Sequence, residues 1–160
     1  IEKRGQPMDA EKTPKQRYKE ETAPYRAWLN SISIPIGLIV LFIAVFLGFT
    51  INAAGEILVI FAIVTHVVYA RIHVPKICHV APILYYVYNV LSIFYVMTLI
   101  AQPQGSMLVA ILSLINFLVL ILVIVFYFIG ANAIKKQFPT MKEDYERAVE
   151  VYKGRKSSSK

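Results

Sequence analysis

The chain has 160 residues, of which 57% are hydrophobic, and its formal net charge is +7 at neutral pH. Between Ser31 and Ile134 the only formally charged residues are Glu56, Arg71 and Lys76. This excludes an ordinary soluble domain, whose surface is covered by charged side chains. The basic residues flank apolar segments, and neither terminal segment carries a motif that reads RNA or DNA, so a membrane protein without a nucleic-acid partner is predicted.

Residues 1–30 form a polar N-terminal tail. Residues 1–27 contain three prolines, seven Lys or Arg and five Asp or Glu, a mixture that predicts mostly irregular structure. At the end of the tail, Tyr25, Arg26 and Trp28 are typical of a membrane–water interface. The first residue is Ile1 rather than Met, which fits a removed presequence and a shortened chain equally well.

Residues 31–134 contain four apolar segments, which predict an all-α polytopic membrane protein with four transmembrane helices arranged as two hairpins. The expected spans are about 32–50, 53–71, 77–101 and 106–134. The uncharged part of the second span, residues 57–70, covers roughly 21 Å as a helix against a ~30 Å hydrocarbon layer. We therefore extend this span back to residue 53 and place Glu56 near the interface.

Small and polar side chains within the spans predict where helices pack. Ala44 and Gly48 form a small-xxx-small pair, which permits close approach of another helix. The third and fourth spans carry polar stripes that we assign to interhelical packing, namely Asn89, Ser92, Ser113 and Asn116. The alternative for these stripes is a polar groove that binds a quinone, lipid or solute, although such pathways usually contain ionisable groups.

The distribution of Lys and Arg predicts the orientation. The N-terminal tail has seven, the hairpin between the second and third spans has two and the C-terminal segment has eight, whereas the other two turns have none. With four spans, all 17 cations lie on one side of the membrane. Both termini are therefore expected on the cytosolic or matrix side. The endomembrane system is the expected location, and the mitochondrial inner membrane is the alternative.

The three histidines all lie near the basic hairpin, at His66, His73 and His79. His66 and His79 are weak candidates for ligating haem or a transition metal, because they are expected at matching depth on neighbouring helices. No carboxylate is close enough in sequence to orient them, so hydrogen bonding to the backbone or to lipid headgroups is the favoured role. Cys78 is the only cysteine, and the sequence contains no phosphate-binding loop and no catalytic motif. We predict no cofactor and no enzymatic activity.

Residues 135–160 form a C-terminal tail with an amphipathic helix over 140–153. Thr140 and Glu143 have the spacing of a capping box. The apolar face comprises Met141, Tyr145, Val149 and Tyr152. We expect this apolar face to bind a partner, and the four acidic and three basic residues of the polar face favour a protein over an anionic membrane surface.

These features predict a non-catalytic accessory or scaffold subunit of a larger integral membrane complex, in contact with the lipid bilayer and with other membrane-protein subunits. One alternative is a small transporter, a channel component or a lipid-handling protein. The other is a membrane anchor that binds haem or a quinone.

Overall fold

The computed structural model describes residues 13–48, 54–101 and 106–158. This part of the chain is helical, with no strands. Its elements are α1 (Pro14–Phe46), α2 (Ala54–Ile72), the 3-10 helix η1 (Lys76–His79), α3 (Val80–Ala101), α4 (Met107–Gln137) and α5 (Met141–Ser158). Four helices are long and apolar enough to cross a membrane: α1, α2, α3 together with η1, and α4. The predicted all-α fold with four candidate spans is confirmed.

The first helix begins far earlier than the sequence analysis predicted. The expectation of irregular structure is wrong for residues 14–27, which form the first turns of α1. Thr13 caps this helix: its side-chain oxygen accepts from the backbone of Gln16 at 3.4 Å, and its own N–H donates to the Gln16 side chain at 2.9 Å. Pro14 occupies the first helical position, where its missing N–H costs little. These residues were the overlooked start signal.

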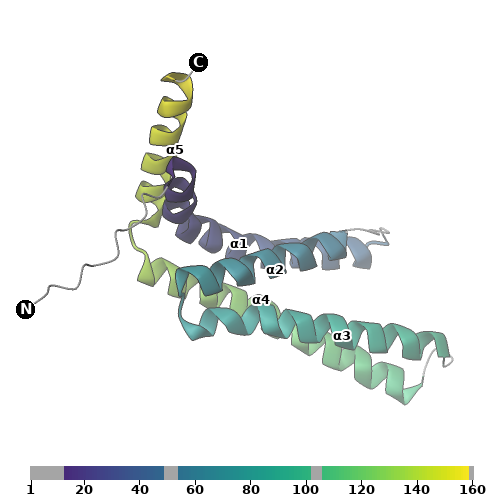
Figure 1. Cartoon of the computed structure of the whole chain (residues 1–160). Coiled ribbons are helices and arrows are strands. Elements are labelled where there is room, and N and C mark those ends of the chain that lie inside the picture. The colour runs from purple at the N-terminus through teal and green to yellow at the C-terminus, as the bar shows by residue number, and fades with distance from the viewer. Residues whose placement is uncertain (1–12, 49–53, 102–105, 159–160) are drawn as a thin grey trace, which may run out of the picture.

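The helices form two hairpins, α1 with α2 and α3 with α4, and α1 also packs along α4 (Figure 1). The end of α1 and the start of α2 lie at the same end of the bundle as the end of α3 and the start of α4. At the opposite end are η1, α5 and the first turns of α1, with α5 beside α1 (Figure 1). Both chain ends of the described structure therefore lie at the end of the bundle that carries the basic hairpin.

The interior consists of two hydrophobic clusters. The first lies between the spans and includes Ile34, Leu38, Tyr85, Val123 and Tyr127. The second lies nearer α5 and joins residues of α1, α2, η1 and α4 to α5, namely Ala27, Tyr69, Val74, Cys78, Ile134 and Met141. By contrast, large apolar side chains of all four spans remain uncovered on the outside. Such an outer surface is suited to lipid rather than to water.

Glycines mark where helices approach closely, and the predicted pair is not among these places. Gly48 follows the end of α1 with φ of +85°, and nothing described lies within 4 Å of a Cβ built there. The prediction that Ala44 and Gly48 form a packing motif is therefore wrong, because the helix ends at Phe46, before Gly48. Gly48 instead has the left-handed conformation common just after a helix end.

Close approaches lie at Gly37 in α1, where a Cβ would be 2.9 Å from the Leu58 side chain of α2, and at Gly130 in α4. A Cβ built on Gly130 would be 3.4 Å from the Cα of Cys78 in η1. The Cys78 thiol also donates to the Gly130 carbonyl, with the sulfur 3.5 Å from the oxygen. The turn at η1 is thus packed directly on the backbone of α4.

We predict that Gly130→Leu destabilises the protein, because a side chain there meets the backbone of η1. The expected loss is about 1–3 kcal/mol, the scale of overpacking a well-filled core. Gly55→Leu is the control, because nothing lies within 4 Å of a Cβ at Gly55. Unfolding by denaturant in detergent micelles measures both, and equal losses would contradict the assigned contact.

Cysteine labelling tests the orientation. Cysteines placed at Lys15 and Lys153, both exposed, should react with a membrane-impermeant reagent from the cytosolic or matrix side only. A cysteine at Met107, which is 80% exposed at the start of α4, should react from the other side only. The native Cys78 is buried and sets the background. Labelling of Lys15 and Lys153 variants from opposite sides would overturn the four-span arrangement.

Candidate functional site

Buried polar side chains gather where the spans meet the second hydrophobic cluster. The Tyr69 hydroxyl in α2 hydrogen bonds to the Ser31 hydroxyl in α1, and both residues are buried. One turn away along α2, buried Thr65 accepts a hydrogen bond from the Asn30 amide at 3.1 Å. Sequence reasoning overlooked Asn30, Ser31 and Thr65. Their position near the ends of apolar spans could have revealed them, because polar residues there need hydrogen-bond partners inside the protein.

The structure brings the two weak candidate histidines together. The rings of His66 in α2 and His79 in η1 have centroids 5.1 Å apart. His66 Nδ1 is 3.2 Å from the Tyr86 hydroxyl in α3, and the His79 ring meets Tyr69 edge-on at 5.9 Å. His73 lies in the turn between α2 and η1 and has φ of +54°.

Through these contacts, the histidine pair packs α2 against η1 and α3. Among the described residues, no group of three or more His, Cys, Asp or Glu side chains is placed to hold a metal ion. The imidazoles lie within a chain of aromatic contacts that runs from Tyr69 through His79 and His66 to Tyr86. That chain ties α2 to η1 and α3.

Hydrogen bonds also join α3 to α4. The Ser92 hydroxyl donates to the Asn116 side-chain oxygen at 3.1 Å. The Asn116 amide nitrogen lies 3.4 Å from the Leu91 carbonyl of α3 and 3.1 Å from the Leu112 carbonyl of its own helix. Asn116 therefore bridges the two helices through two hydrogen bonds and makes a third within its own helix.

The other two polar residues assigned to this pairing behave differently. Asn89 donates to the Tyr85 carbonyl within α3 at 2.7 Å. Ser113 is exposed on α4, so its assignment to helix packing is wrong. Ser113 and Asn116 are three residues apart and hence point about 60° apart around the helix. That rotation is enough to place one in the interface and the other on the outer surface.

The apolar face of α5 packs against α1. The Tyr145 ring lies against Tyr25 with centroids 4.7 Å apart, and the Tyr152 ring stacks on Tyr18 at 4.6 Å. Met141 is buried in the second cluster. Val149, on the same face, is half-buried. The stripe Met141, Tyr145, Val149 and Tyr152, which the sequence analysis assigned to another protein, therefore has a covering helix in this chain.

The outer side of α5 remains open. Its two described ion pairs, Lys142 with Glu146 and Arg147 with Asp144, have nitrogen–oxygen distances of 3.9 Å and are largely exposed, so they contribute little to stability. Val151 is 53% exposed and lies, with Arg147, at the margin of the contact between α5 and the first turns of α1. We call residues 14–27 of α1 together with α5 the α1–α5 pair.

We predict that Asn116→Leu weakens the fold by about 1 kcal/mol, the scale of an interhelical hydrogen bond in a membrane. The Leu side chain cannot replace the bonds to Ser92 and to the Leu91 carbonyl. Ser113→Leu is the matched control, because it places the same side chain one turn earlier on the exposed surface of α4. Unfolding in detergent should separate the two variants, and equal stabilities would contradict the bridging role of Asn116.

Comparisons with protein-family models, with curated proteins and with solved structures give no match to this chain. Its function is therefore inferred from the contacts described above.

Proposed function

We propose that the protein is a non-catalytic accessory or scaffold subunit of a larger membrane complex. The observation that carries this proposal is the α1–α5 pair, in which a helix that continues into the first span is joined to a second helix outside the spans. A partner bound to this pair is held in a fixed position relative to the membrane domain.

The way polar groups are used within the spans supports the same role. Asn30, Ser31, Thr65 and Asn116 all have hydrogen-bond partners on neighbouring helices. These bonds fix the helices relative to one another, as a scaffold requires. The outer faces of the spans are apolar and offer contact to lipid and to the spans of other subunits.

The open margin of the α1–α5 pair around Val151 has the composition of a protein-binding surface. An exposed apolar side chain, Val151, lies among charged residues that include Glu150 and Arg147. Interfaces commonly have an apolar centre and a polar rim. We place this surface in the cytosol or matrix, because the basic residues lie in segments at the same end of the bundle.

We expect Val151→Asp to reduce the amount of a stoichiometric partner that co-purifies in mild detergent. A buried apolar contact at a protein interface is worth about 1–2 kcal/mol, so recovery should fall by about tenfold. The stability of the isolated protein should not change, since Val151 is largely exposed. Crosslinking from α5 to the partner locates the contact.

Lys142→Asp is the matched control for this experiment. Lys142 is also exposed, but it lies nine residues before Val151, about two and a half helical turns, and thus on the opposite side of α5. Partner recovery should survive this change. A protein that purifies without any stoichiometric partner, or that keeps its partner with Val151→Asp, would contradict the scaffold role assigned to α5.

A further inference from the structure

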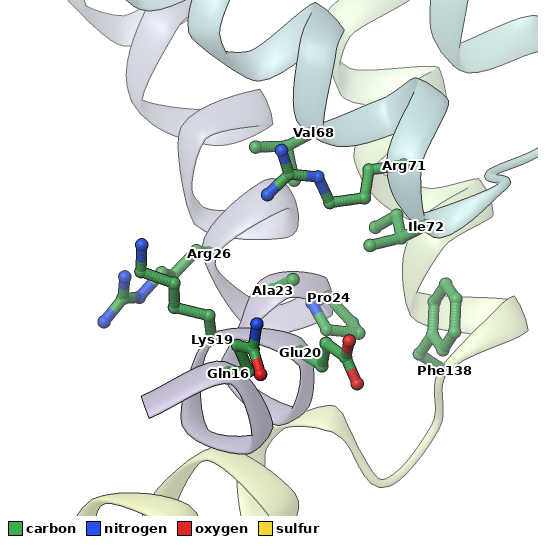
Figure 2. A pocket seen from close by; sticks show the side chains of 10 residues that line it. All are labelled: Gln16, Lys19, Glu20, Ala23, Pro24, Arg26, Val68, Arg71, Ile72 and Phe138. Atoms are coloured by element: carbon green, nitrogen blue, oxygen red, sulfur yellow. The ribbon is translucent and has the colours of Figure 1, made fainter. Parts of the chain in front are cut away.

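A pocket of about 670 Å³ lies at the base of the α1–α5 pair. It is formed where the first turns of α1 meet the last turns of α2 and the segment that follows α4 (Figure 2). Its apolar wall includes Pro24 from α1, Val68 and Ile72 from α2, and Phe138 beyond α4. This pocket is separate from the hydrogen bonds within the spans and from the surface of α5 that we assign to a partner.

Three cations from two helices line the same pocket: Lys19 and Arg26 from α1, and Arg71 from α2. Figure 2 shows the Arg71 side chain reaching across from α2 towards the side where Lys19 and Arg26 lie. Glu20 is also in the lining and lies on the side of Pro24 and Phe138 in this view. Three cations and one carboxylate leave the pocket with a formal charge of +2.

One of the cations is held in place by its neighbours. The Arg26 guanidinium donates to the Tyr18 hydroxyl at 3.1 Å and lies over the Tyr18 ring, 5.4 Å from its centroid. Tyr18 in turn stacks on Tyr152 of α5. Arg26 is therefore fixed by the α1–α5 pair, which lowers the entropy cost of binding an anion there.

The position of the pocket identifies the ligand as part of the membrane. Tyr25 lies between the lining residues Pro24 and Arg26, and Trp28 follows within the same turn; such aromatic residues favour the level of the lipid headgroups. Lys135 and Lys136 end the last span at the same end of the bundle. A pocket at this depth with cations on one side and apolar walls on the other matches an amphiphile with an anionic head.

We propose that this pocket binds one anionic phospholipid from the adjacent leaflet. The phosphate lies between Lys19, Arg26 and Arg71, where charge-assisted hydrogen bonds favour it. The glycerol and the first part of the acyl chains lie against Val68, Ile72 and Phe138. A soluble phosphate ester has the same head chemistry but cannot use the apolar wall.

The test titrates the full-length protein in detergent with dioleoylphosphatidylserine and counts bound lipids by native mass spectrometry. One phosphatidylserine should bind at least about fivefold more tightly than dioleoylphosphatidylcholine, since each basic residue contributes about 1 kcal/mol toward an anionic lipid. Equal binding of the two lipids would overturn the proposal. A millimolar excess of glycerol 3-phosphate should not displace the lipid, whereas full displacement would assign the pocket to soluble phosphate esters.

Arg71→Gln and Lys19→Gln should each weaken phosphatidylserine binding by about fivefold. Lys76→Gln is the matched control, because Lys76 is an exposed cation of the same hairpin that does not line the pocket. It should leave binding within twofold. Equal losses with Arg71→Gln and Lys76→Gln would show general attraction to the basic surface and would overturn the site. The substituted cations are exposed, and an unfolding measurement in detergent verifies that each variant remains folded.

This experiment is independent of the proposed function. A scaffold subunit without the lipid site would still lose its partner with Val151→Asp, and a lipid-binding protein without a partner would still distinguish Arg71→Gln from Lys76→Gln.

Discussion

Water cannot reach the interior of a membrane, so each polar side chain there needs a partner within the protein. This requirement organises the bundle. Ser31 pairs with Tyr69, Asn30 with Thr65 and Ser92 with Asn116, and each pair joins helices that are neighbours in sequence order. Tyr127 shows the cost of the same requirement: its hydroxyl is buried without a hydrogen-bond partner among the described residues.

A second set of contacts joins the spans to the polar part of the chain. Aromatic rings of α1 and α5 meet at two points, Tyr25 with Tyr145 and Tyr18 with Tyr152. Most of the stability of a helix in a protein comes from packing of its apolar face rather than from helix propensity. The two helices therefore stabilise one another. The first turns of α1 also form, with α2 and Phe138, the cationic pocket that we assign to a phospholipid.

Hydropathy was enough to predict the four spans, because apolar segments of membrane length have few other stable arrangements. The polar residues of the third and fourth spans likewise predicted packing between these helices, and Ser92 and Asn116 hydrogen bond to each other. The helix over residues 14–27 was missed because prolines and mixed charge were given more weight than the cap at Thr13. Because residues 14–27 were not predicted to be helical, the sequence also did not show that they cover the apolar face of α5. Ala44 and Gly48 were misassigned because the spacing of two small residues does not reveal where their helix ends. Neither the pocket nor the contact between His66 and His79 is local in sequence, since each depends on how separate helices meet.

The length of α5 determines how far its C-terminal end lies from the bundle. Its 18 residues extend about 27 Å from Met141, which is buried against the bundle, to the far end of the helix. In Figure 1 this helix runs across the direction of the spans rather than continuing it. A flexible tail would allow an attached protein to occupy many positions around the bundle. A helix anchored by Tyr145 and Tyr152 instead acts as a spacer that sets how far to the side of the bundle a bound protein is held.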